Sequence, residues 1–166
     1  MAHITLNGTP CTTSGDLPKV GTKAPGFHLV NAKLEEVTLD HFRGKRKIVS
    51  IVPSLDTPVC ATSTKRFDEV AAKDPSLVVL VVSSDLPFAQ GRFCSTAGTS
   101  HVQALSMMRD RHFARDYGVL IQDGPLAGIT ARAVLVLDGD DTVRYAELVP
   151  EIAQEPHYEA ALAALK

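Results

Sequence analysis

The sequence predicts an α/β fold: a three-layer sandwich with a mixed central sheet, preceded by an N-terminal β-hairpin. Two largely apolar runs rich in β-branched residues, 48–52 and 77–82, are typical of strands that are covered on both faces. Two later strand patterns, 133–137 and 143–149, are joined by a tight turn and followed by an Ala- and Leu-rich helix over 156–166. Strands that alternate with helices in this way indicate helices packed on one sheet.

The N-terminal part of the chain predicts short extended segments. Residues 4–6 and 9–13 contain β-forming residues on either side of Asn7-Gly8, a dipeptide that tolerates the positive φ angles of a type I′ turn. We therefore expect a hairpin here. Residues 14–23 contain two glycines and a proline and predict a loop, and residues 37–39 predict a brief strand.

The middle of the chain predicts a turn, a strand and a long helix. The basic run 43–47 predicts a solvated turn before the first buried strand. From Pro53 a polar turn leads into a helix whose apolar residues share one face, and we expect this helix to run to about Lys73. Asp74-Pro75 ends it, because the residue before a proline is disfavoured in the α region.

The segments after the second buried strand are short. Residues 87–94 predict a short helix with Asp85 as its cap, and residues 102–107 predict a short strand. Residues 110–117 predict another short helix, closed by Gly118. The complete order of elements is that of a thioredoxin-like domain.

Composition and charge restrict the possible functions. The chain has 166 residues, of which 45% are apolar and 22% charged, with a net charge of −2, so we expect a single globular domain spanning 1–166. This balance argues against nucleic acid as a partner, because phosphate binding requires a basic excess. The longest apolar run, 77–82, is far shorter than the roughly 20 residues that span a bilayer, so we expect no membrane contact. No secretory signal opens the sequence, and we expect a cytoplasmic location.

The three cysteines, Cys11, Cys60 and Cys94, are too few and too widely spaced for a disulfide scaffold. The sequence has no C-x-x-C pair and no histidine at metal-ligand spacing, so we expect no metal. The remaining alternatives for each cysteine are a buried inert thiol and a reactive one.

Cys60 lies in a segment that suits a reactive thiol. Thr57 is a candidate N-cap with Pro58 at the first helical position, which places Cys60 in the first turn of a helix. Unpaired N–H groups and the helix dipole stabilise a thiolate there, and the thiolate is the nucleophilic form of cysteine. Pro53 and Pro58 would hold the loop rigidly. The alternative, a plain helix cap with Cys60 as a small buried residue, stays equally open on these local grounds.

The pattern Pro53-x-x-x-Thr57-x-x-Cys60 resembles the active-site signature of the peroxiredoxins. Gly21-Thr22-Lys23-Ala24-Pro25-Gly26-Phe27 is similar to the entry segment of that family. Further segments resemble its bacterial thiol peroxidase branch and extend the likeness over nearly the whole chain: 54–60, 86–90 with 92–94, 123–126, 131–133 and 155–162.

This resemblance implies roles for five residues. Cys60 would be the peroxidatic cysteine, whose thiolate attacks the O–O bond and becomes a sulfenic acid. Thr57 would offer its hydroxyl to the thiolate and the peroxide, and Pro53 would shield the sulfur from water. Arg132 would be the active-site arginine of the family. Its chemistry suits this role, since a guanidinium favours an anionic sulfur and offers donors to two adjacent oxygens. Cys94 would be the resolving cysteine, which condenses with the sulfenic acid to an intramolecular disulfide.

The resemblance also implies hydrogen peroxide and organic hydroperoxides as substrates, thioredoxin as the reductant, a homodimer, and an antioxidant reaction that needs no cofactor. Because Cys60 and Cys94 are expected on different helices, we infer that both segments unwind during turnover to bring their Cα atoms within about 7 Å. Cys11 matches no redox position of the family and is expected to be a bystander.

Two alternatives remain at this point. A general disulfide oxidoreductase of the same fold is disfavoured, because the helix carries Cys60 without a C-x-x-C partner. A redox sensor that uses a Cys60–Cys94 switch to change shape for a partner would form the same disulfide. Catalytic turnover with an electron donor separates the enzyme from the sensor, and insulin-type disulfide reduction separates it from the oxidoreductase.

Overall fold

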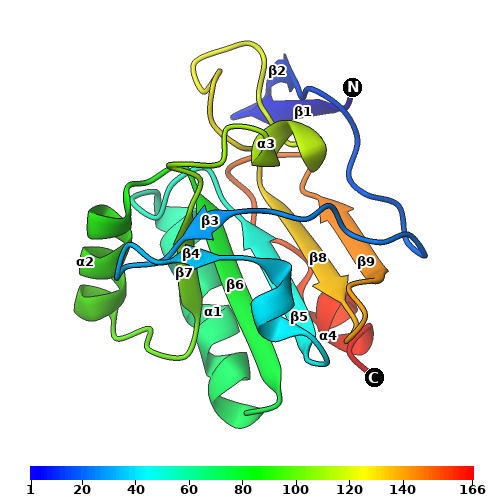
Figure 1. Cartoon of the computed structure of the whole chain (residues 1–166). Coiled ribbons are helices and arrows are strands. Elements are labelled where there is room, and N and C mark those ends of the chain that lie inside the picture. Colours follow the sequence, from blue (N-terminus) through cyan, green and yellow to red (C-terminus); the bar gives the residue numbers. More distant parts are fainter.

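The computed structural model describes residues 1–166 and contains a central sheet flanked by helices, with a separate hairpin at the N-terminal end (Figure 1). The sheet strands are β3 (Leu29–Val30), β4 (Glu36–Val37), β5 (Arg46–Ile51), β6 (Leu77–Ser83), β7 (Gln103–Ser106), β8 (Ala133–Leu137) and β9 (Val143–Leu148). They form one seven-stranded sheet in the order β4-β3-β7-β6-β5-β8-β9. The helices are η1 (Leu39–Phe42), α1 (Pro58–Lys73), α2 (Pro87–Ala97), α3 (Phe113–Asp116) and α4 (Tyr158–Ala163).

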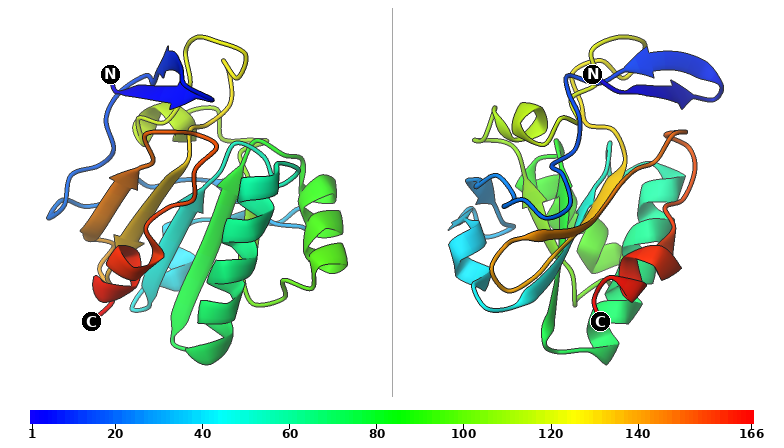
Figure 2. Two further views of the ribbon diagram at one scale, coloured as in Figure 1. Left: turned by 180° about the vertical axis from the view of Figure 1, so that it is seen from behind. Right: turned by 90° about the vertical axis from the view of Figure 1, so that its right-hand side faces the viewer.

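The sheet is mixed, as the sequence predicts. β5, β6 and β7 are parallel neighbours, and β8 pairs antiparallel with β5 on the other side. Helices α1 and α4 cover one face, and η1 and α3 lie over the opposite face, whereas α2 lies beside β7 (Figure 2). The predicted three-layer thioredoxin-like arrangement is confirmed.

Each central strand contributes to two apolar clusters, one on each face of the sheet. Val49, Leu80 and Leu135 face each other in register and pack under η1 and α3. Their chain neighbours Ile48 and Val79 pack on the opposite face with residues of α1 and α4. Because both faces are covered, most positions of these strands are apolar, which explains the long apolar runs in the sequence.

The N-terminal hairpin forms as predicted, from β1 (His3–Leu6) and β2 (Thr9–Thr12). Asn7 and Gly8 adopt φ angles of 50° and 82°, which a type I′ turn requires. The long helix α1 also ends where the sequence places its end, with Asp74 as C-cap. None of the helices is both long enough and apolar enough to cross a membrane.

Several element boundaries differ from the prediction. β4 ends at Val37, because Thr38 and His41 form the capping box of η1 and turn the chain away from the sheet. Helix α2 continues to Ala97 and ends at Gly98 in the left-handed region. The last helix is shorter than predicted, as are α3 and β7, and β3 is a strand that the sequence analysis missed.

The prediction that residues 43–47 form a solvated turn is wrong for the last two of them, because Arg46 and Lys47 are the first residues of β5. Lys47 lies opposite Leu137 of β8, with its side chain completely buried. Its ammonium group pairs with Asp141 in the acidic turn that follows β8, and this pairing compensates the loss of water.

Candidate active site

Cys60 lies in the first turn of α1, directly after the loop that follows β5. Thr57 is the N-cap residue and Pro58 occupies the first helical position, as the sequence predicts. The Thr57 carbonyl accepts the first intrahelical bond, from the Ala61 N–H at 3.1 Å. The Cys60 side chain packs into the apolar cluster beneath α1 and is completely buried. Burial alone would favour the neutral thiol, so a reactive Cys60 requires a compensating positive charge.

That charge is Arg132, whose Nη1 donates to Cys60 Sγ at 3.2 Å. Arg132 immediately precedes β8, and the first residue of β8, Ala133, pairs with Ile51 at the end of β5. This pairing places the arginine beside the point where the chain leaves the sheet toward Cys60. The Arg132 side chain is also buried, and its Nε donates to the Ile152 carbonyl at 2.9 Å. The structure thus brings a buried positive charge within hydrogen-bond distance of the Cys60 sulfur.

The loop between β5 and α1 is held by a carboxylate from the end of β6. Asp85 accepts hydrogen bonds from the Ser54 hydroxyl at 2.7 Å and from the Leu55 N–H at 2.8 Å. The Ser83 hydroxyl donates to the same carboxylate at 2.8 Å. These contacts position the loop that leads to Thr57 and Cys60.

The prediction that Asp85 caps α2 is therefore wrong. Leu86 occupies the N-cap position, and the Asp85 carboxylate points to a different segment. A signal for this role exists in the sequence. Asp85 follows β6 and Ser54 follows β5, and the carboxyl ends of adjacent parallel strands meet at the same edge of a sheet.

Thr57 and Pro53 both lie in this loop. The Thr57 hydroxyl donates to the Ser54 carbonyl at 2.9 Å, so its proton is already engaged in this conformation. Its oxygen lone pairs are still able to accept a hydrogen bond. Pro53 is buried next to Val52, whose backbone N–H donates to the Val82 carbonyl and whose carbonyl accepts the Thr130 hydroxyl.

Cys94 lies on α2, on a different element from Cys60, and all three cysteines are free thiols. It is half-buried and lines a hollow of about 340 Å³ between α2, the segment before β4 and the segment around β7. The two cysteines predicted to react with each other thus belong to separately packed helices.

Cys11 lies on β2 and packs in the cluster under the hairpin. Burial, and then the negative charges of Asp123 and Glu151, raise the pKa of its thiol. Both effects favour the protonated form, which is a poor nucleophile.

Comparisons with known proteins agree on the family. Residues 19–162 match the Redoxin family model. The thiol peroxidase of Mycobacterium tuberculosis is 56% identical over 165 residues, and the match covers 99% of both chains. The thiol peroxidase of Leptospira interrogans is 51% identical over 166 residues, covering 99% of this chain and 97% of that protein. The crystal structure of a peroxiredoxin-like protein from Aquifex aeolicus matches with a TM-score of 0.92 and 42% identity, covering 99% of this chain and 96% of that one.

A thioredoxin-like fold with a cysteine in the first turn of a helix, and a buried arginine against its sulfur, defines a peroxiredoxin-type peroxidase. The sequence identity of 56% with a thiol peroxidase, over 99% of both chains, narrows this class to the thiol peroxidases. The chain belongs to the thiol peroxidase family. The resemblance inferred from the sequence is confirmed, and so is the assignment as an enzyme.

Proposed function

We propose that this thiol peroxidase reduces hydrogen peroxide and organic hydroperoxides with Cys60 as the peroxidatic cysteine. The Cys60 thiolate attacks one oxygen of the O–O bond, which breaks; the sulfur becomes a sulfenic acid, and the other oxygen leaves with a proton as water or an alcohol. The observation that carries this proposal is the 3.2 Å contact between Arg132 Nη1 and Cys60 Sγ inside a buried site.

Arg132 acts in both halves of this step. Its guanidinium stabilises the thiolate before the attack, and its fixed donors then stabilise the negative charge that develops on the departing oxygen. Pro53, buried in the preceding loop, keeps water from the sulfur. The Thr57 hydroxyl donates to Ser54, so its contribution is to accept a hydrogen bond from the peroxide; donation to the thiolate would require that bond to break.

Cys94 is the proposed resolving cysteine. Its thiol attacks the sulfenic sulfur of Cys60, which releases water and leaves an intramolecular disulfide. The first turn of α1 and part of α2 must unwind for this step. α2 suits such opening, because most of its residues are exposed or half-buried and it contains Gly91 in its interior.

A dithiol donor then exchanges with the Cys60–Cys94 disulfide, becomes oxidised itself, and restores both thiols. We assign this role to thioredoxin and place the reaction in the reducing cytoplasm, where such a donor is regenerated. No cofactor is needed in this cycle, because sulfur is both the nucleophile and the electron carrier.

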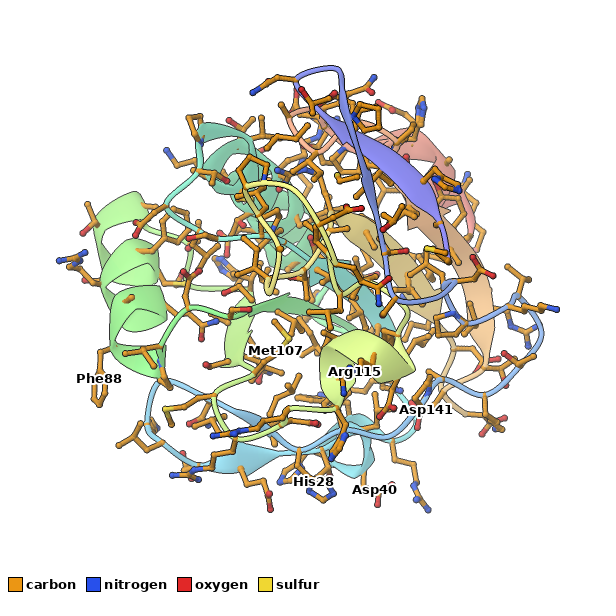
Figure 3. All side chains as sticks on the ribbon, turned by 90° about the horizontal axis from the view of Figure 1, so that it is seen from above. His28, Asp40, Phe88, Met107, Arg115 and Asp141 are labelled. Carbon is orange, nitrogen blue, oxygen red and sulfur yellow. The ribbon has the colours of Figure 1, made fainter.

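Residues 1–166 act as one domain in this proposal, and the protein works as a homodimer. Ile4 and Cys11 of the hairpin share an apolar cluster with Leu135 of the sheet, which supports the single domain. The dimer is supported by an exposed apolar patch at the start of α2. Phe88 is 67% exposed and projects from α2 into solvent (Figure 3), and Leu86 beside it is 53% exposed.

The decisive experiment counts thiols and measures intact mass before and after one equivalent of hydrogen peroxide. The wild type should fall from three free thiols to one and lose two hydrogens, and Cys94→Ser should retain a sulfenic acid on Cys60. Survival of all three thiols would overturn the proposal. Oxidation of NADPH through thioredoxin reductase and thioredoxin then separates a peroxidase from a sensor, which would be oxidised without multiple turnovers.

A further inference from the structure

The Glu151 side chain joins the N-terminal hairpin to the loop between β9 and α4. Its carboxylate accepts hydrogen bonds from the Thr5 hydroxyl at 2.6 Å, the Asn7 N–H at 2.8 Å and the Gly8 N–H at 3.1 Å. A fourth donor, the Ala153 N–H at 3.0 Å, comes from its own loop. The predicted Asn7-Gly8 turn therefore does more than reverse the chain, because it directs two backbone N–H groups at one carboxylate.

The backbone reinforces this connection on both sides of Glu151. The Thr5 N–H donates to the Pro150 carbonyl at 2.8 Å, and the Ile152 N–H donates to the Thr5 carbonyl at 2.8 Å. Thr5 and Glu151 form a parallel bridge. Strand β1 thus holds the three residues 150–152 by side-chain and main-chain contacts together.

This same loop sets the orientation of the arginine at the sulfur. The Ile152 carbonyl, one residue beyond Glu151, accepts the hydrogen bond from Arg132 Nε at 2.9 Å. A guanidinium is planar and rigid, so fixing the direction of Nε–H restricts where Nη1 can point. In this structure Nη1 points at Cys60 Sγ. A displacement of the Ile152 carbonyl would rotate the guanidinium away from the sulfur.

We propose that Glu151 is a positioning residue for the peroxidase reaction, and that strand β1 and the Asn7-Gly8 turn of the hairpin hold it in place. The connection runs from the hairpin through Glu151 to the Ile152 carbonyl, then through Arg132 to Cys60. This inference rests on the proposed role of Cys60. A merely structural Glu151 would affect stability and leave the reactivity of the folded protein unchanged.

Asp123 offers a matched control. Its carboxylate also binds the hairpin, accepting from the Thr12 N–H at 2.7 Å and the Thr12 hydroxyl at 3.1 Å. Asp123 lies in the loop before β8, and its hydrogen bonds hold strand β2 rather than the segment that contacts Arg132. Loss of either carboxylate loosens the hairpin, but only loss of Glu151 is expected to disturb the arginine.

The test compares Glu151→Ala, Glu151→Gln and Asp123→Ala in the full chain, each in a Cys94→Ser background that isolates the first step. Two readouts are taken at temperatures where circular dichroism shows each variant folded. One is the rate at which Cys60 reacts with hydrogen peroxide, followed by trapping and mass spectrometry of its sulfenic acid. The other is the pH profile of Cys60 alkylation by iodoacetamide.

We expect Glu151→Ala to slow Cys60 oxidation about tenfold and to move the alkylation profile to higher pH, because an incorrectly oriented guanidinium stabilises the thiolate less. Glu151→Gln retains one acceptor oxygen, so its oxidation rate and its alkylation profile should lie between those of Glu151→Ala and those of the Cys94→Ser parent. Asp123→Ala should remain within about twofold of the parent.

Parent-like rates and profiles in folded Glu151→Ala would overturn the inference, as would equal effects of Glu151→Ala and Asp123→Ala. If Glu151→Ala does not fold, Glu151→Gln decides by the same criteria. If the parent itself forms no sulfenic acid at Cys60, the proposed function fails; the alkylation profiles still determine whether Glu151 positions Arg132.

Discussion

At the scale of single residues, the site depends on one charged contact inside an apolar cluster. Cys60 and Arg132 are both almost completely buried, and Nη1 lies 3.2 Å from Sγ. A buried guanidinium requires partners, and the Ile152 carbonyl and the Cys60 sulfur supply them. The protein thereby tolerates a buried cation, and the same contact supports the proposed reactivity of Cys60.

Replacement of Arg132 should slow the first step without removing the nucleophile. We expect Arg132→Met to lower the rate of Cys60 oxidation about 100-fold, because oriented donors at a developing charge are worth two to three orders of magnitude. Arg132→Lys should recover only part of this loss, since an ammonium cannot bind Ile152 and the sulfur through one rigid plane. Stopped-flow oxidation in the Cys94→Ser background measures both variants, and an unchanged rate in Arg132→Met would contradict the assigned role.

Substitution of Cys60 and substitution of Cys11 should have opposite effects on activity. Cys60→Ser should abolish peroxide reduction, because a neutral hydroxyl replaces the thiolate. Cys11→Ala should keep activity within about twofold of the wild type, since Cys11 is buried under the hairpin and its burial favours the thiol. A thioredoxin-coupled assay measures both, and strong loss of activity in a folded Cys11→Ala variant would show that the bystander assignment is wrong.

At the scale of secondary-structure elements, the ends of adjacent parallel strands provide the framework of the site. Strands β5 and β6 end at the same edge of the sheet, where Asp85 after β6 binds Ser54 and Leu55 after β5. Asp85 also directly precedes the N-cap of α2, the helix that carries Cys94. The loop that leads to Cys60 is therefore held by the residue that precedes the helix carrying Cys94.

Asp85→Ala should destabilise the protein by about 2 kcal/mol, because it removes an ionised acceptor from three donors at once. We also expect slower Cys60 oxidation, since the loop before α1 loses its attachment. Urea unfolding and single-turnover oxidation measure the two effects. Asp56→Ala is the matched control, an exposed carboxylate in the same loop, and equal destabilisation by both variants would exclude a specific role for Asp85.

The attachment of the hairpin should depend on pH. Hydrogen bonds, first from Thr5 and then from Ala153, Gly8 and Asn7, lower the pKa of Glu151 from 4.5 to about 2. Because the folded-state pKa lies below the unfolded one, Glu151 stabilises the fold above pH 4.5, and this stabilisation disappears as the pH falls from 4.5 to 2. The difference in unfolding free energy between wild type and Glu151→Gln should therefore shrink across this interval in urea titrations. A constant difference would contradict the ionic contribution.

At the scale of the whole molecule, two apolar clusters sandwich the sheet, and one exposed patch remains on α2. Leu86 and Phe88 are the large apolar side chains of this patch, and Ala89 and Arg92 border the same shallow hollow. Exposed patches of this kind mark interaction sites on soluble proteins. The patch lies at the start of the helix that carries Cys94, so a partner subunit there would contact a segment that unwinds in the proposed reaction cycle.

Phe88→Asp should convert the proposed homodimer to a monomer, because a desolvated charge without a partner opposes association. Light scattering coupled to size-exclusion chromatography measures the molar mass at several concentrations. Val20→Asp is the control, since Val20 is 61% exposed in the N-terminal loop away from α2. A dimer that persists in Phe88→Asp would move the interface elsewhere, and a monomeric wild type would remove the dimer from the proposal.

Local sequence signals predict many of the helices and strands of this molecule. Thr57 and Pro58 predict the start of α1 and hence the position of Cys60, because capping preferences act within one helical turn. The two apolar runs predict central strands, and Asn7-Gly8 predicts the hairpin, because periodicity and turn chemistry are also local. The family resemblance then supplied Arg132 and Cys94, which no local pattern singles out.

Contacts between distant segments were decided only by the tertiary structure. Arg132 lies 72 positions beyond Cys60, and the antiparallel pairing of β5 with β8 brings the two together. Asp85 reads as a helix cap in the sequence, yet the carboxylate binds the loop after β5, because parallel strands end side by side. The sequence by itself predicted most of the elements and the place of Cys60 in the first turn of α1, because the causes of both lie within a few residues. Three features required the tertiary structure: Arg132 beside Cys60, Asp85 bound to the loop after β5, and the link from the hairpin to Arg132. The sheet register brings these residues, which are far apart in the chain, to within hydrogen-bond distance.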